Sequence, residues 1–592
     1  MPADRKMWNK RSLGTPLICA VAVILVAVSA GSCARDIPAP DRSIKRYYDK
    51  LPEISRNANS RAPLVAIVNL SPKLPSVIEI SATADGAEEF RREFAVATAG
   101  AVALPIIGLR PDSDYVVKVA LRGPQSREVL AERELNYRTP PLPGGETNFP
   151  PFQVLRAEPA RMEPGYTLIG VRRRALGRPQ YQTERQRKFA TDWGMIIALD
   201  AQGRVVWYYD AGTRVAGIDQ LKNGNLLFHE TQFRTREIDL LGNVVNEWYA
   251  ERRPQGPSET PGAIPIKGIQ TLHHQPHELP NGNFLAFAAN ARKVEDYYTS
   301  DTDRSAPRQA QMVMGDDVVE FDRKGDVVWR WSSWDHLDPM RIGYDTIWAY
   351  WWVRGFDQHM DWTHGNGVSY DVQDDSVIIS LRHQDAILKI ERPSGEIKWI
   401  LGEPTDWPDK LRSKLLQPVG DLTWPYHQHN PRMTEAGTLI VFDNHAYGAR
   451  PFIEPTAPFD SFSRGVEFRI NEQDMTVEQV WSSATERNDD SCFTAAMGDA
   501  HRLPITGNRL VIHAFCVPYR KDVTYDNFDL SKRHTDDFAY GGRIREYASD
   551  SSPGDIVFNV EAKDPNDLMQ WEIYGGLRTP SLYGSSNDQS PS

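Results

Sequence analysis

Histidines are unevenly placed along this chain of 592 residues, and their positions suggest chemistry. All fourteen lie at or after His229. Three of them, His427, His429 and His445, fall within nineteen residues, at the expected boundary between two apolar strands. An imidazole at such a place can serve as a nucleophile, a proton shuttle or a metal ligand. Because a lone histidine is more often structural, the case depends on partners elsewhere in the chain.

Two histidines share one spacing from a glycine turn. His274 lies eight residues before Gly282 of a Pro-Asn-Gly-Asn turn, and His429 lies eight residues before Gly437. A third segment, Asp-Trp-Thr-His-Gly-Asn at 361–366, precedes an apolar strand that ends in Ser-Leu-Arg-His-Gln at 380–384. The spacing predicts equivalent positions in copies of one repeat, with histidine, arginine and asparagine directed toward a common axis.

A strand, a turn and a second strand ending in aromatic residues recur along the chain. The copies begin near residues 194, 236, 317 and 386, with weaker copies near 465 and 542. Between them lie glycine turns followed by apolar strands. Two hairpins per repeat make four strands, and tandem four-stranded units are typical of a β-propeller. The sequence therefore predicts an all-β fold, with a six-bladed propeller over 151–592 whose loops at one end of the channel build the site. The aromatic insertion at 341–356 is one such loop.

The first 150 residues predict export and a small separate domain. Lys6, Lys10 and Arg11 precede an apolar run, and Ala-Gly-Ser-Cys33 follows it, so residues 1–33 read as a signal peptide. The end of this segment resembles a bacterial lipobox, in which Cys33 carries the lipid. A soluble exported protein and a retained anchor are the alternatives. Residues 34–60 are expected to be a tether, 61–140 a β-sandwich and 141–150 a linker.

Charge and cysteine content narrow the partners and the compartment. The net charge of −11 argues against a nucleic-acid partner, which requires a basic face. The chain has four cysteines. Cys19 leaves with the signal and Cys33 would carry lipid, which leaves Cys492 and Cys516 as an even pair. In the periplasm, or elsewhere outside the cytoplasmic membrane, a disulfide between them is expected.

These motifs together resemble those of the bacterial aryl sulfate sulfotransferases. The shared elements are Asp-Trp-x-His-x-Asn, then Arg-His-Gln, then Gln-His with a later Phe-Asp-Asn. The resemblance covers most of the chain after about residue 60. It implies a periplasmic six-bladed propeller with a small N-terminal β-sandwich. It also implies an enzyme that moves a sulfuryl group from one phenol to another without a nucleotide donor or other cofactor.

The resemblance also implies roles for particular residues. His429 matches the nucleophile, which becomes a transient sulfohistidine, while His364 and Arg382 match the sulfate-binding pair. One further sulfate-site histidine is either His273 or His274, and the eight-residue spacing favours His274. Further candidates for substrate contact are Asn366, as a hydrogen-bond donor, and Trp362 and Tyr426, as rings that stack on a phenol.

Other functions are weighed against this one. The trio His273, His274 and His277 has a tempting spacing for a metal, but no cysteine or carboxylate accompanies it, so no metal is expected. The segment Cys516-Val-Pro-Tyr-Arg520 fits the short core of the sulfatase motif, a match that arises easily by chance. No glycine-rich phosphate loop indicates a nucleotide donor. The alternative from a different class is a non-catalytic envelope propeller that binds a ligand or protein partner. A homodimer is left open, and contact with the membrane is expected only through the lipid anchor.

Overall fold

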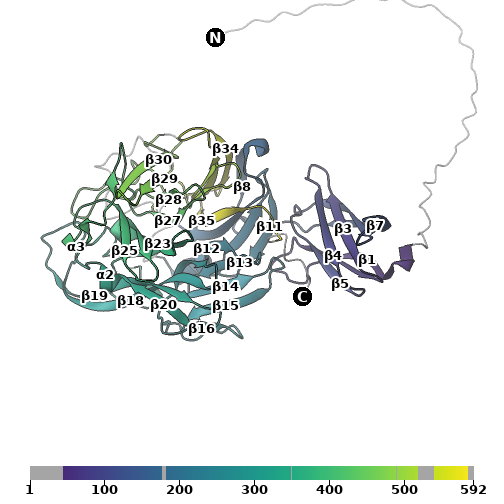
Figure 1. Cartoon of the computed structure of the whole chain (residues 1–592), viewed down its shortest axis with the longest axis horizontal. Helices are drawn as coiled ribbons and strands as arrows, with labels where there is room; N and C mark the ends of the chain where they lie inside the picture. Colours follow the sequence, from purple (N-terminus) through teal and green to yellow (C-terminus); the bar gives the residue numbers. More distant parts are fainter. Residues whose placement is uncertain (1–43, 177–181, 348–349, 489, 518–538, 584–592) are drawn as a thin grey trace, which may run out of the picture.

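The computed structural model describes residues 44–176, 182–347, 350–488, 490–517 and 539–583, and most of the regular secondary structure in these ranges is β-strand. The predicted all-β class is confirmed. A group of N-terminal strands lies beside a larger body of sheets (Figure 1). No helix in these described ranges is long and apolar enough to span a membrane. The predicted signal segment and Cys33 lie outside them. The α-helices are α1 (Glu184–Thr191), α2 (Ser333–His336) and α3 (Asp409–Arg412).

Two antiparallel sheets form the N-terminal group and enclose one apolar core. Strand β1 lies within the segment predicted to be a tether, so that prediction is wrong for this part. The cause is the burial of Tyr48 and Pro52 on one face of β1, which pairs with β2. The first sheet has the order β1 (Tyr48–Arg56), β2 (Ala66–Pro72), β5 (Val102–Ile106), and the second has the order β4 (Phe90–Val96), β3 (Ser76–Thr83), β6 (Asp114–Arg122), β7 (Val129–Arg138).

Six further sheets, each of four or five strands in its main path, make up the rest of the chain. The first joins the two ends of this region, because its order is β11 (Val205–Asp210), β10 (Met195–Leu199), β9 (Tyr166–Ala175), β35 (Met569–Thr579). The second runs β12 (Val215–Gln220), β13 (Leu226–Glu230), β14 (Arg234–Ile238), β15 (Val244–Ala250), β16 (Ile264–Ile266). The third runs β17 (His273–Glu278), β18 (Phe284–Tyr297), β19 (Gln309–Phe321), β20 (Val327–Ser332), with β21 (His359–Asp361) beside β19.

The last three sheets follow the same pattern. The fourth runs β22 (Gly365–Asp371), β23 (Ser376–Leu381), β24 (Ala386–Glu391), β25 (Ile397–Gly402). The fifth runs β27 (His429–Met433), β28 (Leu439–Asp443), β29 (Arg464–Asn471), β30 (Thr476–Ser482), β26 (Gln417–Pro418). The sixth runs β31 (Asp499–Arg502), β32 (Arg509–His513), β33 (Gly542–Tyr547), β34 (Ile556–Ala562), β8 (Phe152–Ala157).

One edge strand from each of the six sheets contacts the corresponding strand of the next sheet. The contacts run from β12 to β17, β22, β27, β31 and β35, and β35 returns to β12. Glycines allow the close approach. A Cβ on Gly217 of β12 would lie 2.5 Å from the Cβ of Gln275, and one on Gly367 of β22 would lie 2.6 Å from the backbone nitrogen of Asn430. These six strands are called the inner strands below.

In five of the six predicted repeats, a tryptophan at the end of the repeat ties one sheet to the next. The indole N–H of Trp207 donates to the Leu240 carbonyl at 3.0 Å, and that of Trp248 donates to the Arg323 carbonyl at 3.1 Å. A buried indole N–H requires an acceptor, so each tryptophan fixes the position of a turn in the neighbouring sheet. Later sheets make similar contacts, with Trp329 donating to the Arg392 carbonyl, Trp399 to the Glu472 carboxylate and Trp481 to the Pro553 carbonyl.

Buried ion pairs reinforce the same junctions. In four sheets a carboxylate on the third strand accepts from an arginine of the following sheet. Asn side chains of the glycine turns complete three of these sites, as with Asn281 and Asn283 on Glu320. Such carboxylates are satisfied on several sides, which makes their burial tolerable. The pairs are Glu237 with Arg323, Glu320 with Arg392, Glu467 with Arg509, and Glu546 with Arg578.

Candidate active site

Four of the six inner strands are interrupted near their N-terminal ends, and the predicted site residues lie at three of these places. Pairing slips between His273 and His277 in β17, and between His429 and Arg432 in β27. A similar slip occurs in β22 and in β12. His274 and His364 have positive φ values of 61° and 46°. Bulges re-aim side chains, and such backbone conformations are costly for residues other than glycine. Turning these imidazoles away from regular strand positions therefore lowers the stability of the fold.

His429 is held in one tautomer by its neighbours. Its Nδ1 lies 2.6 Å from Oδ1 of Asn444. The amide nitrogen of Asn444 donates to the carbonyls of Thr494 and Met497, at 2.7 and 2.9 Å. Since this nitrogen must face the two carbonyls, Oδ1 faces His429 as an acceptor, and Nδ1 of His429 carries the hydrogen. The lone pair is therefore on Nε2, where it accepts from the backbone N–H of Met497 at 3.1 Å.

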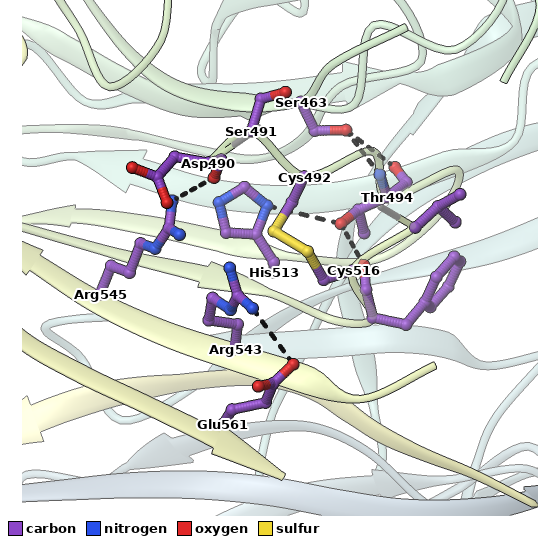
Figure 2. Close-up of a disulfide and its surroundings, with 12 residues drawn as sticks. Ser463, Asp490, Ser491, Cys492, Thr494, His513, Cys516, Arg543, Arg545 and Glu561 are labelled. Atoms are coloured by element: carbon purple, nitrogen blue, oxygen red, sulfur yellow. Dashed lines mark hydrogen bonds and ion pairs between the residues drawn. A yellow bond between two sulfur atoms is a disulfide. The ribbon is translucent and has the colours of Figure 1, made fainter. Parts of the chain in front are cut away.

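The segment 492–497, which supports His429, is fastened by a disulfide. Cys492 and Cys516 are bonded with an S–S distance of 2.04 Å, so the predicted pair is confirmed (Figure 2). The backbone on either side is also fixed, because Ser463 N–H donates to the Cys492 carbonyl and the Thr494 hydroxyl donates to the Phe515 carbonyl. The bridge thus anchors the chain that presents Met497 to His429.

His364 has a different support. Its Nδ1 lies 2.6 Å from Oδ2 of Asp361, and the other oxygen of Asp361 accepts from the indole of Trp351 at 2.8 Å. Because a carboxylate accepts, Nδ1 of His364 carries the hydrogen and Nε2 carries the lone pair. Burial raises the pKa of Asp361 to about 6, against the opposing charge of His383. The ring of Tyr350 lies edge-on to His364, with 4.4 Å between centroids.

The structure separates His273 from His274. His273 stacks on Phe287, and its Nε2 lies 3.0 Å from Asp316. Its Nδ1 meets Nδ1 of His274 at 2.8 Å. The ring of His274 contacts that of His364, with 5.2 Å between centroids. His273 is therefore the support, and His274 is the member of the pair that lies beside His364.

Arg382 is buried and only partly paired. One terminal nitrogen lies 2.6 Å from Nε2 of His383. The other donates to Asp345 at 3.0 Å and to the Ala495 carbonyl at 3.3 Å. Its Nε–H has no hydrogen-bond partner among the described residues. A buried guanidinium with a spare donor suits a tetrahedral oxyanion.

The site keeps its histidines neutral. Burial, followed by the charge of Arg382, holds the pKa of His429 and of His364 well below the ordinary value. Burial, followed by the charge of His273, does the same to the pKa of His274. A neutral imidazole retains a lone pair, which a nucleophile or base needs. The arrangement can therefore offer lone pairs and a permanent cation to an anionic substrate.

The remaining predicted contacts fall into two groups. Asn366 is buried at the site, where its amide donates to the Gln428 carbonyl at 2.8 Å. Tyr426 is half-buried and lies edge-on to His445. Trp362, by contrast, is fully buried against Trp334, and its indole donates to the Arg341 carbonyl. The prediction that Trp362 stacks on a substrate is therefore wrong, because the ring belongs to the sheet core.

Several site residues were not singled out from the sequence. Asp361 begins the Asp-Trp-x-His motif, and Asn444 ends the Phe-Asp-Asn motif, so each stood in a motif without an assigned role. Asp316, Asp345 and Met497 carry no such local signal. Asp361, His364 and His383 also form one of two buried groups, the other being Asp345, His383 and His427, whose ligand atoms all lie within 4.8 Å of one another. The first group contains the hydrogen bond between His364 and Asp361, and in the second Nε2 of His427 lies 3.8 Å from Oδ2 of Asp345.

The protein is all-β, and its buried site holds three neutral histidines and an arginine. Such a site has the groups needed to bind an anion. The arylsulfotransferase (ASST) family model matches residues 173–567. The chain belongs to the arylsulfotransferase family, as its motifs predicted.

Similarity to individual proteins is more limited. The proteins called Arylsulfate sulfotransferase AssT from Escherichia coli O6:H1 (strain CFT073) and from Lelliottia amnigena are each 28% identical, over 347 and 349 residues. The matches cover 49% and 50% of this chain and 53% of either relative, so the chain spans about half the length of the curated relatives it matches. A solved structure of a protein of unknown function from Bacteroides caccae covers 70% of this chain and all of its own, at 12% identity and a TM-score of 0.34, which is too low to define the fold.

Proposed function

We propose that this chain is a nucleotide-independent aryl sulfotransferase. It moves a sulfuryl group from a phenolic sulfate ester to a phenolic acceptor, in ping-pong order, through a sulfohistidine at His429. The observation that carries this is the fixed Nε2 lone pair of His429, in a site that also holds Arg382. Membership of the arylsulfotransferase family supports the substrate class.

In the first half-reaction, the Nε2 lone pair of His429 attacks sulfur. The Nε2–S bond forms, and the bond between sulfur and the aryl oxygen breaks with its electron pair on that oxygen. The hydrogen bond from the Met497 N–H to Nε2 must break before the attack, because it uses the same lone pair that bonds to sulfur. The transition state should be loose, with charge spread over the sulfuryl oxygens, so a cation such as Arg382 stabilises it.

A proton accompanies the leaving group. The sulfate ester is an anion, and its arrival favours the charged form of nearby imidazoles. His364, or His274 beside it, is then protonated when the first half-reaction begins, and it gives its proton to the departing phenolate. In the second half-reaction the neutral imidazole takes the proton of the acceptor phenol. The new phenolate oxygen attacks sulfur, the Nε2–S bond breaks, and His429 regains its lone pair.

The proposed architecture and location complete the function. We propose that the six sheets from residue 151 form a six-bladed propeller. Support comes from the inner strands, whose contacts close on themselves from β12 to β35. The sheets of 61–140, with β1, then form the β-sandwich. By its N-terminal sequence the protein is exported to the periplasm or the outer side of the cytoplasmic membrane, and Cys33 would carry a lipid anchor.

The test is transfer from 4-nitrophenyl sulfate to phenol. Nitrophenol release that depends on phenol supports transfer, whereas release independent of phenol indicates a hydrolase, and no release favours a binding protein. In a second measurement, donor alone should increase the mass of the intact protein by one SO₃ group. H429A should lose this increase, and H336A, whose ring stacks on Trp331, is the matched control. Full transfer by H429A would overturn the assignment.

A further inference from the structure

A carboxylate stands behind the two adjacent histidines of β17. Asp316 of β19 is almost fully buried, and its Oδ2 accepts from the Thr363 hydroxyl and from the backbone N–H of Gly365, both at 2.5 Å. Its other oxygen, Oδ1, lies 3.0 Å from Nε2 of His273. The described residues place no lysine or arginine within ion-pair distance of this carboxylate, so His273 is the counter-charge available to it.

The contact between Asp316 and His273 depends on charge rather than on alignment. Neither Oδ1 of Asp316 nor Nε2 of His273 has a hydrogen-bond partner among the described residues, although the two atoms are only 3.0 Å apart. A lone pair on Nε2 would face the carboxylate and repel it, so Nε2 carries a hydrogen. Burial opposes the charge of Asp316, yet its pKa is lowered, because the contact with His273 and the bonds from Thr363 and Gly365 outweigh burial. A buried carboxylate that stays ionised requires a cation beside it, which an imidazolium at His273 supplies.

The other titratable groups that the charge of His273 reaches are neutral imidazoles. Burial, followed by the charge of His273, lowers the pKa of His229 of β13 to about 3. Burial also holds the pKa of His274 and of His364 well below the ordinary value. One positive charge at His273 therefore balances one negative charge at Asp316.

This charge fixes the tautomer of His274. An imidazolium carries hydrogen on both nitrogens, so Nδ1 of His273 donates to Nδ1 of His274 at 2.8 Å. A neutral His274 that accepts at Nδ1 has its hydrogen on Nε2, which is the reverse of His429 and His364. Nε2 of His274 has no hydrogen-bond partner among the described residues, and its ring lies beside that of His364. This N–H is therefore available to a substrate.

We propose that Asp316 and His273 are positioning residues that make His274 a fixed hydrogen-bond donor to the sulfuryl group. His274 donates from Nε2 to a sulfuryl oxygen while it remains neutral, and no proton leaves it. Charge that builds on this oxygen during the transfer strengthens the bond. The proton of the aryl oxygen is then moved by His364, with Asp361 behind it. This inference rests on the proposed function, because it assigns a role within the sulfuryl-transfer site.

Two substitutions at His273 separate hydrogen bonding from packing. In H273N the amide nitrogen takes the place of Nδ1 and can still donate to His274, whereas H273F fills the ring space against Phe287 but donates nothing. With 4-nitrophenyl sulfate as donor and phenol as acceptor, kcat/KM for the donor should fall about 10²-fold in H273F, the usual loss for one oxyanion donor. In H273N it should stay within about tenfold of the unaltered protein, since the donor is kept.

Packing alone predicts the opposite order of the two variants. An asparagine leaves a cavity beside Phe287 that a phenylalanine fills, so thermal melting should show H273N to be the less stable variant. The matched control is H336F, which replaces a histidine that stacks on Trp331, and it should leave kcat/KM unchanged.

The tautomer can be measured in the unaltered protein without any assay of activity. Nitrogen NMR spectra of protein with isotope-labelled histidines report which ring nitrogen carries hydrogen, and the spectrum of H274A identifies the signals of His274. We expect hydrogen on Nε2 of His274. Hydrogen on Nδ1 instead, or H273F at least as active as H273N, would overturn the inference and leave the proposed function intact. The expected tautomer in an unaltered protein that performs no transfer would refute the proposed function and keep the positioning pair.

Discussion

His429 and His364 lie in the same buried site, and each donates through Nδ1, yet the groups behind them differ in charge. Behind His429 stands the neutral amide of Asn444, fixed by two backbone carbonyls. Behind His364 stands the carboxylate of Asp361. An anion behind an imidazole favours its protonated form, and a neutral acceptor does so much less. The contrast suits a nucleophile that must keep its lone pair and a partner that must gain and lose a proton.

Removing each histidine should have unequal effects. H429A should lower transfer by on the order of 10⁴-fold or more, since the attacking atom is gone. H364A should lower it by roughly 10²- to 10⁴-fold, the usual contribution of one acid–base group. Rapid mixing with 4-nitrophenyl sulfate should still show a burst of nitrophenol with H364A, because that leaving group needs little help. Similar bursts, or none, from both variants would erase the distinction.

Exchanging the two supports tests the contrast directly. N444D places a carboxylate behind His429 and removes the donors to Thr494 and Met497. It should raise the pKa of His429 and slow sulfuryl uptake, the half-reaction in which His429 takes the sulfuryl group from the donor, by about 10²-fold. D361N should instead slow discharge, the half-reaction in which the sulfuryl group passes from His429 to phenol, by about 10²-fold. Single-turnover measurements of the two half-reactions decide between them. Loss of the same half-reaction in both variants would show that the supports merely hold the fold.

The sequence predicted the repeats more completely than the site. Period and aromatic positions were visible, because the same indole contact recurs at successive junctions. The motifs also placed His274, His364, Arg382 and His429, all of which the structure brings into one buried region. The tautomers of His429 and His364 could not be predicted, since they depend on contacts that Asn444 and Asp361 make only in the folded chain, with Thr494, Met497 and Trp351. The burial of Trp362 could not be predicted either, because the same aromatic residue types occur in cores and in binding sites.

The two half-reactions should respond differently to pH. Asp361, with its pKa raised to about 6 by burial, is ionised above that value and loses its charge as pH falls through it. Burial and the charge of Arg382 hold the pKa of His429 well below the ordinary value, so it gains a proton only at lower pH than an ordinary histidine does. From pH 7 to pH 5, discharge to phenol should therefore slow by about tenfold, the fall in ionised Asp361 per unit below its pKa. Sulfuryl uptake should change less, and a parallel fall of both would contradict the assignment.

Breaking the disulfide should weaken the support of His429 and spare that of His364. The bridge between Cys492 and Cys516 fastens the segment that bears Thr494 and Met497. Neither residue contacts Asp361 in the bonds described above. The double variant C492S C516S should lose about 3 kcal/mol of stability. Because the segment keeps its backbone bonds to Ser463 and Val517, uptake should slow only by about fivefold. If discharge slows as much as uptake, the bridge stabilises the whole site, whereas a selective loss of uptake places its effect on the His429 support.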